Sequence, residues 1–208
     1  LTPAGPHAES VFAQMGTARS NLVPLALVVL GLAATAARDR SSGYGLAGGL
    51  VFVATVTAGY ALSVVTAGNP LDGTEQTRLW LIFAGAAAVW ALAWLVSEKR
   101  VPGGTPLAVQ VSLGFGAVGV VCFFPGARLL FRPDTVLPES VAPIGTLGWL
   151  ALALVAGAGF WHARRVYPGA GAAAFAFAGL LSGVLLASAV RTEHGPGRWV
   201  SFHALALM

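Results

Sequence analysis

Long stretches without ionisable residues recur along the chain, and turn-forming Gly, Pro, Ser and Asn residues fall between them. Each stretch supplies the roughly 17–25 apolar residues that a helix needs to cross about 30 Å of hydrocarbon. The pattern predicts six complete membrane-spanning helices, at residues 20–37, 45–67, 79–97, 106–127, 144–162 and 170–190. The apolar run at 199–208 predicts the start of a seventh helix, truncated at Met208.

Strands are a poor alternative, because a membrane barrel shows segments of about ten residues with alternating polarity. These runs are apolar on every face, and within one segment only a helix pairs all of its backbone groups. We therefore expect an all-α integral membrane protein, a single transmembrane helical bundle over residues 1–208. Its short loops make sequential helices antiparallel neighbours.

The composition agrees with a lipid-facing exterior. Hydrophobic residues make up 56% of the chain and charged residues only 10%, against about 25% charged residues in a soluble domain. The net charge of +4 comes from Lys and Arg that stand singly or in pairs between the apolar runs. This placement favours lipid head groups over nucleic acid as their partners. The lone Cys122 lies inside an apolar run and is expected to be a buried thiol.

The distribution of Lys and Arg decides the expected orientation. Each side of the membrane receives six of them, but those after spans one, three and five cluster tightly at the span ends. We expect a plasma-membrane protein with its N-terminus outside. Trp80 and Trp94 bracket the third span, and Trp149 and Trp161 the fifth, as in the aromatic belt at head-group depth.

Small residues are frequent in the spans, for example Gly45 with Gly49, and Gly179 with Gly183. Helices in lipid associate by close packing, which small residues allow. We expect these Gly/Ala-rich faces to pack within the chain. The same faces could also bind a second copy or another membrane protein.

No span carries Asp, Glu, Lys or Arg well inside it, which disfavours a proton or ion-coupled transporter. The second span has the richest polar face, where Tyr60, Ser63 and Thr66 recur every three residues. Those hydroxyls either line a polar cavity or bond back to their own helix. Glu75 and Arg78 are expected to pair at the start of the third helix.

The candidate ligand-facing residues are Tyr60, Ser63, Gln110 and His203. Gln110 opens the fourth span, where it either faces a vestibule or is solvated. His162 and His203 are expected on opposite sides of the membrane and cannot share a haem. His194, His203 and Glu193 match no established metal-site spacing. The sequence thus predicts no metal site and no catalytic residue, and it identifies no cofactor.

A seven-helix bundle with an outside N-terminus and short loops resembles the microbial rhodopsins, at the level of the fold alone. The third span has no acid to serve as counter-ion, and the Lys that holds retinal would fall beyond Met208. Such a resemblance carries little about function. A rhodopsin-like protein with its retinal Lys outside this chain remains an alternative.

Three functional classes remain open, and the sequence favours the first and a non-enzymatic role. The first is a small permease or channel-like protein for a neutral or weakly polar solute, which would use the hydroxyls of the second span. The second is an accessory or assembly subunit of a membrane complex. The third is a membrane-embedded enzyme on a lipid or isoprenoid substrate, with a site near His194, Glu193 and His203.

Overall fold

The computed structural model describes residues 11–131, 145–166 and Gly169. Within these residues the chain is all-helical, without a strand, as the sequence predicts. The helices are α1 (Val11–Asp39), α2 (Ser42–Thr66), α3 (Gly73–Ser97), α4 (Gly104–Phe131) and α5 (Gly145–Val166).

Four of the described helices are long and apolar enough to cross a membrane. Their candidate spans are Leu22–Asp39, Ser42–Thr66, Glu75–Ser97 and Gly104–Val121, which correspond to the first four predicted spans. α5 is helical over most of the predicted fifth span but is not among these four candidates, so its crossing of the membrane stays a prediction. The predicted sixth and seventh spans, at 170–190 and 199–208, lie outside the described residues.

The observed helices extend beyond several predicted limits. α1 begins at Val11 rather than 20, and α4 continues past Pro125 to Phe131 rather than ending at 127. The predicted limits follow the first ionisable or turn-forming residue, whereas a helix keeps its hydrogen bonds beyond the hydrocarbon layer. α3 begins early because Asp72 caps it: its Oδ1 accepts a hydrogen bond from the backbone N–H of Glu75 at 2.9 Å.

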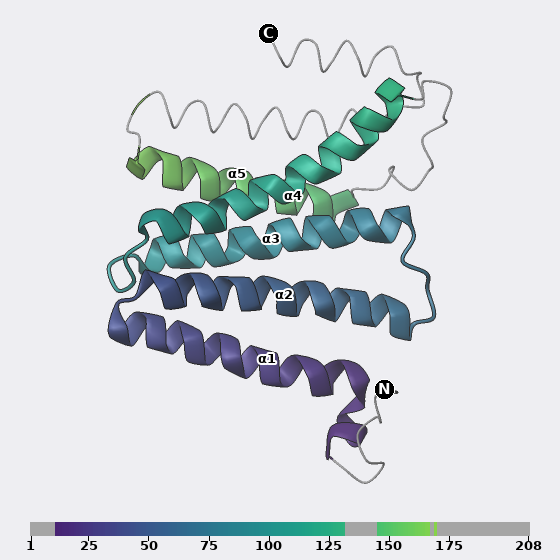
Figure 1. Ribbon diagram of the computed structural model, residues 1–208, viewed down its shortest axis with the longest axis horizontal. Helices are drawn as coiled ribbons and strands as arrows, with labels where there is room; N and C mark the ends of the chain where they lie inside the picture. The colour runs from purple at the N-terminus through teal and green to yellow at the C-terminus, as the bar shows by residue number, and fades with distance from the viewer. Residues whose placement is uncertain (1–10, 132–144, 167–168, 170–208) are drawn as a thin grey trace.

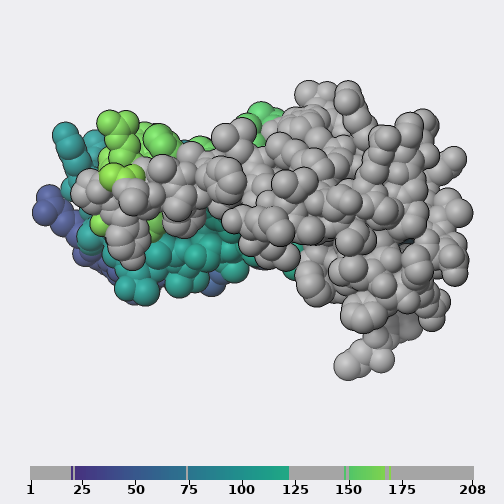
Figure 2. Space-filling model, turned by 90° about the horizontal axis from the view of Figure 1, so that it is seen from above, coloured from purple at the N-terminus to yellow at the C-terminus, as the bar shows by residue number. Residues whose placement is uncertain are grey.

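The helices α1, α2 and α3 lie side by side, and α3 also packs against α4 and α5 (Figure 1). α1 packs mainly against α2, so most of its apolar side chains are exposed; Leu27 and Leu30 are about two-thirds accessible. The space-filling view shows residues of α4 (teal) and α5 (green) next to one another on one face (Figure 2). α3 is therefore the central helix of the described bundle.

Small side chains make this central position possible. Ala84, Ala87 and Ala91 of α3 are completely buried. Because these side chains are small, neighbouring helices approach the middle of the α3 backbone closely, which is how helices associate in lipid. The larger buried side chains Leu81, Leu95 and Leu107 fill the remaining space.

One end of the bundle collects most of the described basic residues. The α1–α2 turn, the α3–α4 loop and the C-terminus of α5 meet there (Figure 1). We call it the cationic end, and its basic residues are Arg38, Arg40, Lys99, Arg100, Arg164 and Arg165. Its acids are paired: Asp39 with Arg38 at 2.8 Å, and Glu98 with Arg165 of α5.

Candidate functional site

The hydroxyl groups of α2 between Thr55 and Thr66 form hydrogen bonds within the protein. Thr55, Thr57 and Thr66 each donate to the carbonyl four residues earlier, at 2.7 Å. Ser63 Oγ donates to the carbonyl oxygen of Tyr60 at 2.7 Å. Of the two readings left open by the sequence, backbone bonding is therefore observed for these groups.

Tyr60 belongs to a polar cluster at the end of the bundle opposite the cationic end. Its hydroxyl donates to Glu75 Oε2 of α3. The other oxygen, Glu75 Oε1, pairs with Arg78 at 2.7 Å, which confirms the predicted Glu75–Arg78 pair. The cluster ties the C-terminal part of α2 to the first turns of α3, so it serves the packing of these two helices.

Gln110 is completely buried rather than solvated at an entrance. Its Nε2 donates to the carbonyl oxygen of Ala87 of α3 at 3.3 Å, and its Oε1 has no partner among the described residues. Burial follows because α2 and α3 cover this face of α4. That Tyr60, Ser63 or Gln110 faces a ligand stays a prediction; His203 lies outside the described residues.

Two indoles of α3 pack on a glycine face of α2. A Cβ atom at Gly45 would lie 2.8 Å from the Trp94 ring, and one at Gly48 would lie 2.9 Å from the Trp90 ring. A Cβ at Gly49 would lie 2.6 Å from both Trp90 Cδ1 and Gln110 Oε1. Only glycine allows so close an approach, so these glycines admit the rings to the helix interface.

Both indole N–H groups donate hydrogen bonds, one to α2 and one to the loop after α3. Trp90 Nε1 donates to the carbonyl oxygen of Gly45 at 3.0 Å, and Trp94 Nε1 donates to that of Val101 at 3.1 Å. The aromatic-belt prediction is wrong for Trp94, which is only 4% exposed. Its ring packs against Gly45 on the glycine face of α2 and is therefore buried between the helices. Trp80 and Trp161 are more than a third exposed, as a belt position requires.

The sequence holds a signal for this arrangement in the spacing of two residue pairs. Gly45 and Gly49 are four residues apart, and so are Trp90 and Trp94. In antiparallel neighbours, two pairs with the spacing of one helical turn can face each other, Gly45 against Trp94 and Gly49 against Trp90. Reading the two spacings together predicts the contact.

A pocket of about 240 Å³ opens between α1, α2 and α3 at the cationic end. We call it the indole pocket; its lining residues are Ala33, Ala36, Ala37, Gly45, Trp90, Ala93, Trp94, Ser97, Arg100 and Val101. From Ser97 to Trp90 the α3 wall runs seven residues, which is about 10 Å of helix. The pocket thus leads from the helix ends toward the interior of the bundle.

The chemistry of the indole pocket is simple. Ser97 Oγ already donates to the carbonyl oxygen of Ala93 at 2.7 Å. The Arg100 side chain is exposed and forms no ion pair or side-chain hydrogen bond within the described part of the chain. An apolar cleft with one free guanidinium can hold an apolar group and attract a negative one.

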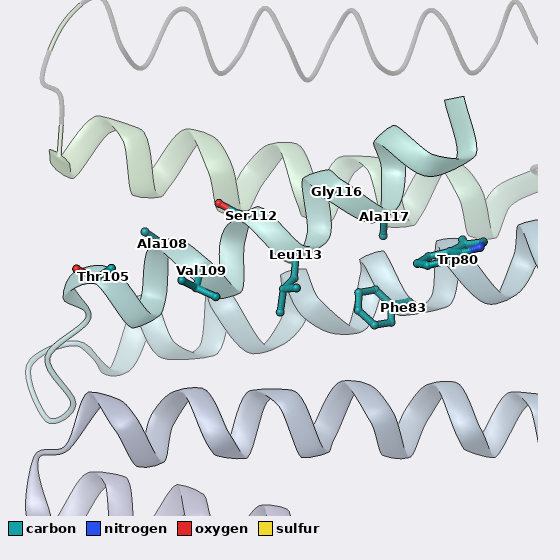
Figure 3. A pocket seen from close by; sticks show the side chains of 9 residues that line it. All are labelled: Trp80, Phe83, Thr105, Ala108, Val109, Ser112, Leu113, Gly116 and Ala117. Carbon is teal, nitrogen blue, oxygen red and sulfur yellow. The ribbon is translucent and has the colours of Figure 1, made fainter. Parts of the chain in front are cut away.

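A larger groove of about 440 Å³ lies between α3 and α4. Figure 3 shows its lining along α4, with Trp80 and Phe83 contributed by α3. The hydroxyls of Thr105 and Ser112 and the indole of Trp80 are the polar side-chain groups among its lining residues, none of which is charged. It therefore offers no feature that would select one apolar chain over another.

The remaining predictions concern metal ligands and residues beyond the described part of the chain. Within the described residues, no three His, Cys, Asp or Glu side chains lie close enough to hold a metal ion. The predictions for the side chains of Cys122 and Trp149, and for Gly179, Gly183, Glu193 and His194, lie outside the described part of the structure.

The indole pocket is thus the described site with both a defined shape and a free charged group. Comparison of the chain with protein-family models, with curated proteins and with solved structures gives no match.

Proposed function

We propose that the protein is a membrane-embedded binding protein for a small amphiphile, whose apolar part enters the indole pocket from the cationic end. The observation that carries this proposal is the composition of the pocket: Ala, Gly and two indoles line its depth, and Arg100, whose side chain has no partner among the described residues, belongs to the loop after α3. An amphiphile has the same division into an apolar body and one polar end.

The sequence favours a permease or channel whose solute path follows the hydroxyls of the second span. If the protein has this function, the solute would have to take another path. The five hydroxyls of α2 from Thr55 to Thr66 bond to their own helix or to Glu75, so they offer little to a passing solute. A neutral or weakly polar solute would instead enter the indole pocket, and its passage would require movement of Trp90, which lines the pocket and packs on α2.

Neither other class gains support from a described residue. The exposed apolar side chains of α1 suit lipid as well as a partner subunit. The residues named for an enzyme site lie outside the described part of the chain. Amphiphile binding is therefore the function that we propose.

Fluorescence quenching by phospholipids with brominated acyl chains tests this proposal on the purified protein in detergent. We expect a saturable quenching component, since a bromine atom in the pocket would touch Trp90 and Trp94. That component should disappear in the Trp90→Phe/Trp94→Phe double variant.

The matched control is Trp80→Phe/Trp161→Phe, which removes two exposed indoles and should keep the saturable component. Quenching that rises in proportion to lipid without saturation, in the wild type and both variants alike, would refute binding in the pocket.

A further inference from the structure

We infer that the ligand of the indole pocket is an anionic phospholipid, with its phosphate on Arg100 and a segment of one acyl chain against Trp90 and Trp94. This inference rests on the proposed function and adds the chemical class of the ligand. Its support comes from the charge balance of the cationic end and from the shape of the pocket.

The cationic end has a surplus of positive charge. Of its six basic residues, Arg38 and Arg165 are paired with its two acids, Asp39 and Glu98. The other four have no acidic partner within the described residues: Arg40, Lys99, Arg100 and Arg164. Clusters of Lys and Arg beside membrane-spanning helices attract anionic lipid head groups, and basic pockets between helices bind them.

Arg100 is distinguished from the other three by its position. It lines the indole pocket, and Arg40, Lys99 and Arg164 do not. A guanidinium can donate two parallel hydrogen bonds to a phosphate, which fixes the head group as well as attracting it. Arg40 and Lys99 add positive charge at the same end, and that charge disfavours the extra cation of a zwitterionic head group.

The dimensions of the pocket fit part of an acyl chain. Its volume of about 240 Å³ is below the roughly 300–1,000 Å³ of pockets that enclose a drug-sized ligand, so it takes a segment of one chain and not a whole lipid. The α3 wall gives a depth of about 10 Å from Ser97 to Trp90. Ala33, Ala36 and Ala37 of α1 leave room for the chain because their side chains are small.

The test is a lipid titration followed by native mass spectrometry of the full chain. The probes are phosphatidylglycerol and phosphatidylcholine with identical acyl chains. We expect the wild type to retain more phosphatidylglycerol than phosphatidylcholine. Arg100→Gln should reduce this preference about fivefold, the effect of one basic residue near an anionic lipid surface.

Arg164→Gln is the matched control, since Arg164 lies at the same end but not in the pocket. It should keep the preference close to the wild type. An equal loss in both variants would show that diffuse charge alone selects the lipid, which would overturn the assignment to Arg100. A second control adds millimolar glycerol phosphate as a competitor. If it displaces bound phosphatidylglycerol as strongly as free phosphatidylglycerol does, the site binds a free phosphate group, which would likewise overturn the inference.

The two proposals fail in different ways. If brominated phosphatidylglycerol and phosphatidylcholine quench Trp90 and Trp94 equally and saturably, the anionic specificity is wrong and amphiphile binding stands. If neither quenches saturably, both are wrong.

Discussion

The indole N–H of Trp90 donates a hydrogen bond to the carbonyl oxygen of Gly45, 3.0 Å away, across the interface of α3 and α2. The ring also packs on Gly48 and Gly49, and it forms part of the wall of the indole pocket. The shape of the pocket therefore depends on the same contacts that hold the two helices together.

Gly49→Ala tests this packing. The new methyl group would meet Trp90 Cδ1 and Gln110 Oε1 at 2.6 Å, and overpacking of this kind costs about 1–3 kcal/mol. We expect a lower thermal midpoint in detergent. Gly31→Ala is the control: its methyl group would meet nothing within 4 Å, and alanine favours the helix, so the midpoint should stay or rise. Equal midpoints in the two variants would contradict the close approach.

Gln110→Leu tests the unpartnered amide oxygen. A buried acceptor without a partner costs free energy, and the Ala87 carbonyl bonded by Gln110 Nε2 lies inside α3, where it also accepts a helical hydrogen bond. We expect the free energy of unfolding to stay unchanged or to rise by up to about 1 kcal/mol. A fall of more than about 2 kcal/mol would mean that Oε1 has a partner such as a buried water.

A double-mutant cycle of Tyr60→Phe and Glu75→Ala tests the cluster at the opposite end. Hydrogen bonds to charged groups contribute more than neutral ones, and the Glu75 side chain is only 17% exposed. We expect a coupling free energy of about 1–2 kcal/mol in chemical unfolding. The same cycle with Tyr44→Phe, at the cationic end, should show no coupling. Coupling near zero in the first cycle would refute the contact.

Lys and Arg cluster at the span ends on one side of the described bundle, while the whole chain has six of them on each side. Loops rich in Lys and Arg stay in the cytoplasm, so we expect the α1–α2 and α3–α4 loops inside and the N-terminus outside. In a Cys122→Ser background, Asn69→Cys should react with a membrane-impermeant maleimide in intact cells, whereas Pro102→Cys should react only after permeabilisation. The reverse pattern would show that the N-terminus is inside.

The helical spans could be predicted because lipid imposes a simple rule on the sequence. Any segment that crosses must be about 20 apolar residues long, and this rule located the four spans from Leu22 to Val121. The Glu75–Arg78 pair could also be predicted, because it depends only on the spacing of two residues within one helix.

The site could not be predicted, because it depends on which helices are neighbours and which faces they turn to each other. Gln110 looks solvated when α4 is read alone, yet α2 and α3 cover it. Trp94 looks like an interfacial anchor until Gly45 is placed opposite it. The indole pocket joins alanines of α1 to indoles of α3, residues more than 50 positions apart, and no spacing within one span reveals it.

The central claim, that the indole pocket holds part of a lipid, is tested most directly by filling it. Ala33 lines the pocket, whereas its neighbour Ala34 is exposed and does not. The measurement is the phospholipid retained per protein after exhaustive delipidation, by native mass spectrometry of Ala33→Phe and Ala34→Phe. We predict that Ala33→Phe loses the tightly bound lipid while Ala34→Phe keeps it. Equal retention in the two variants and the wild type would contradict the claim.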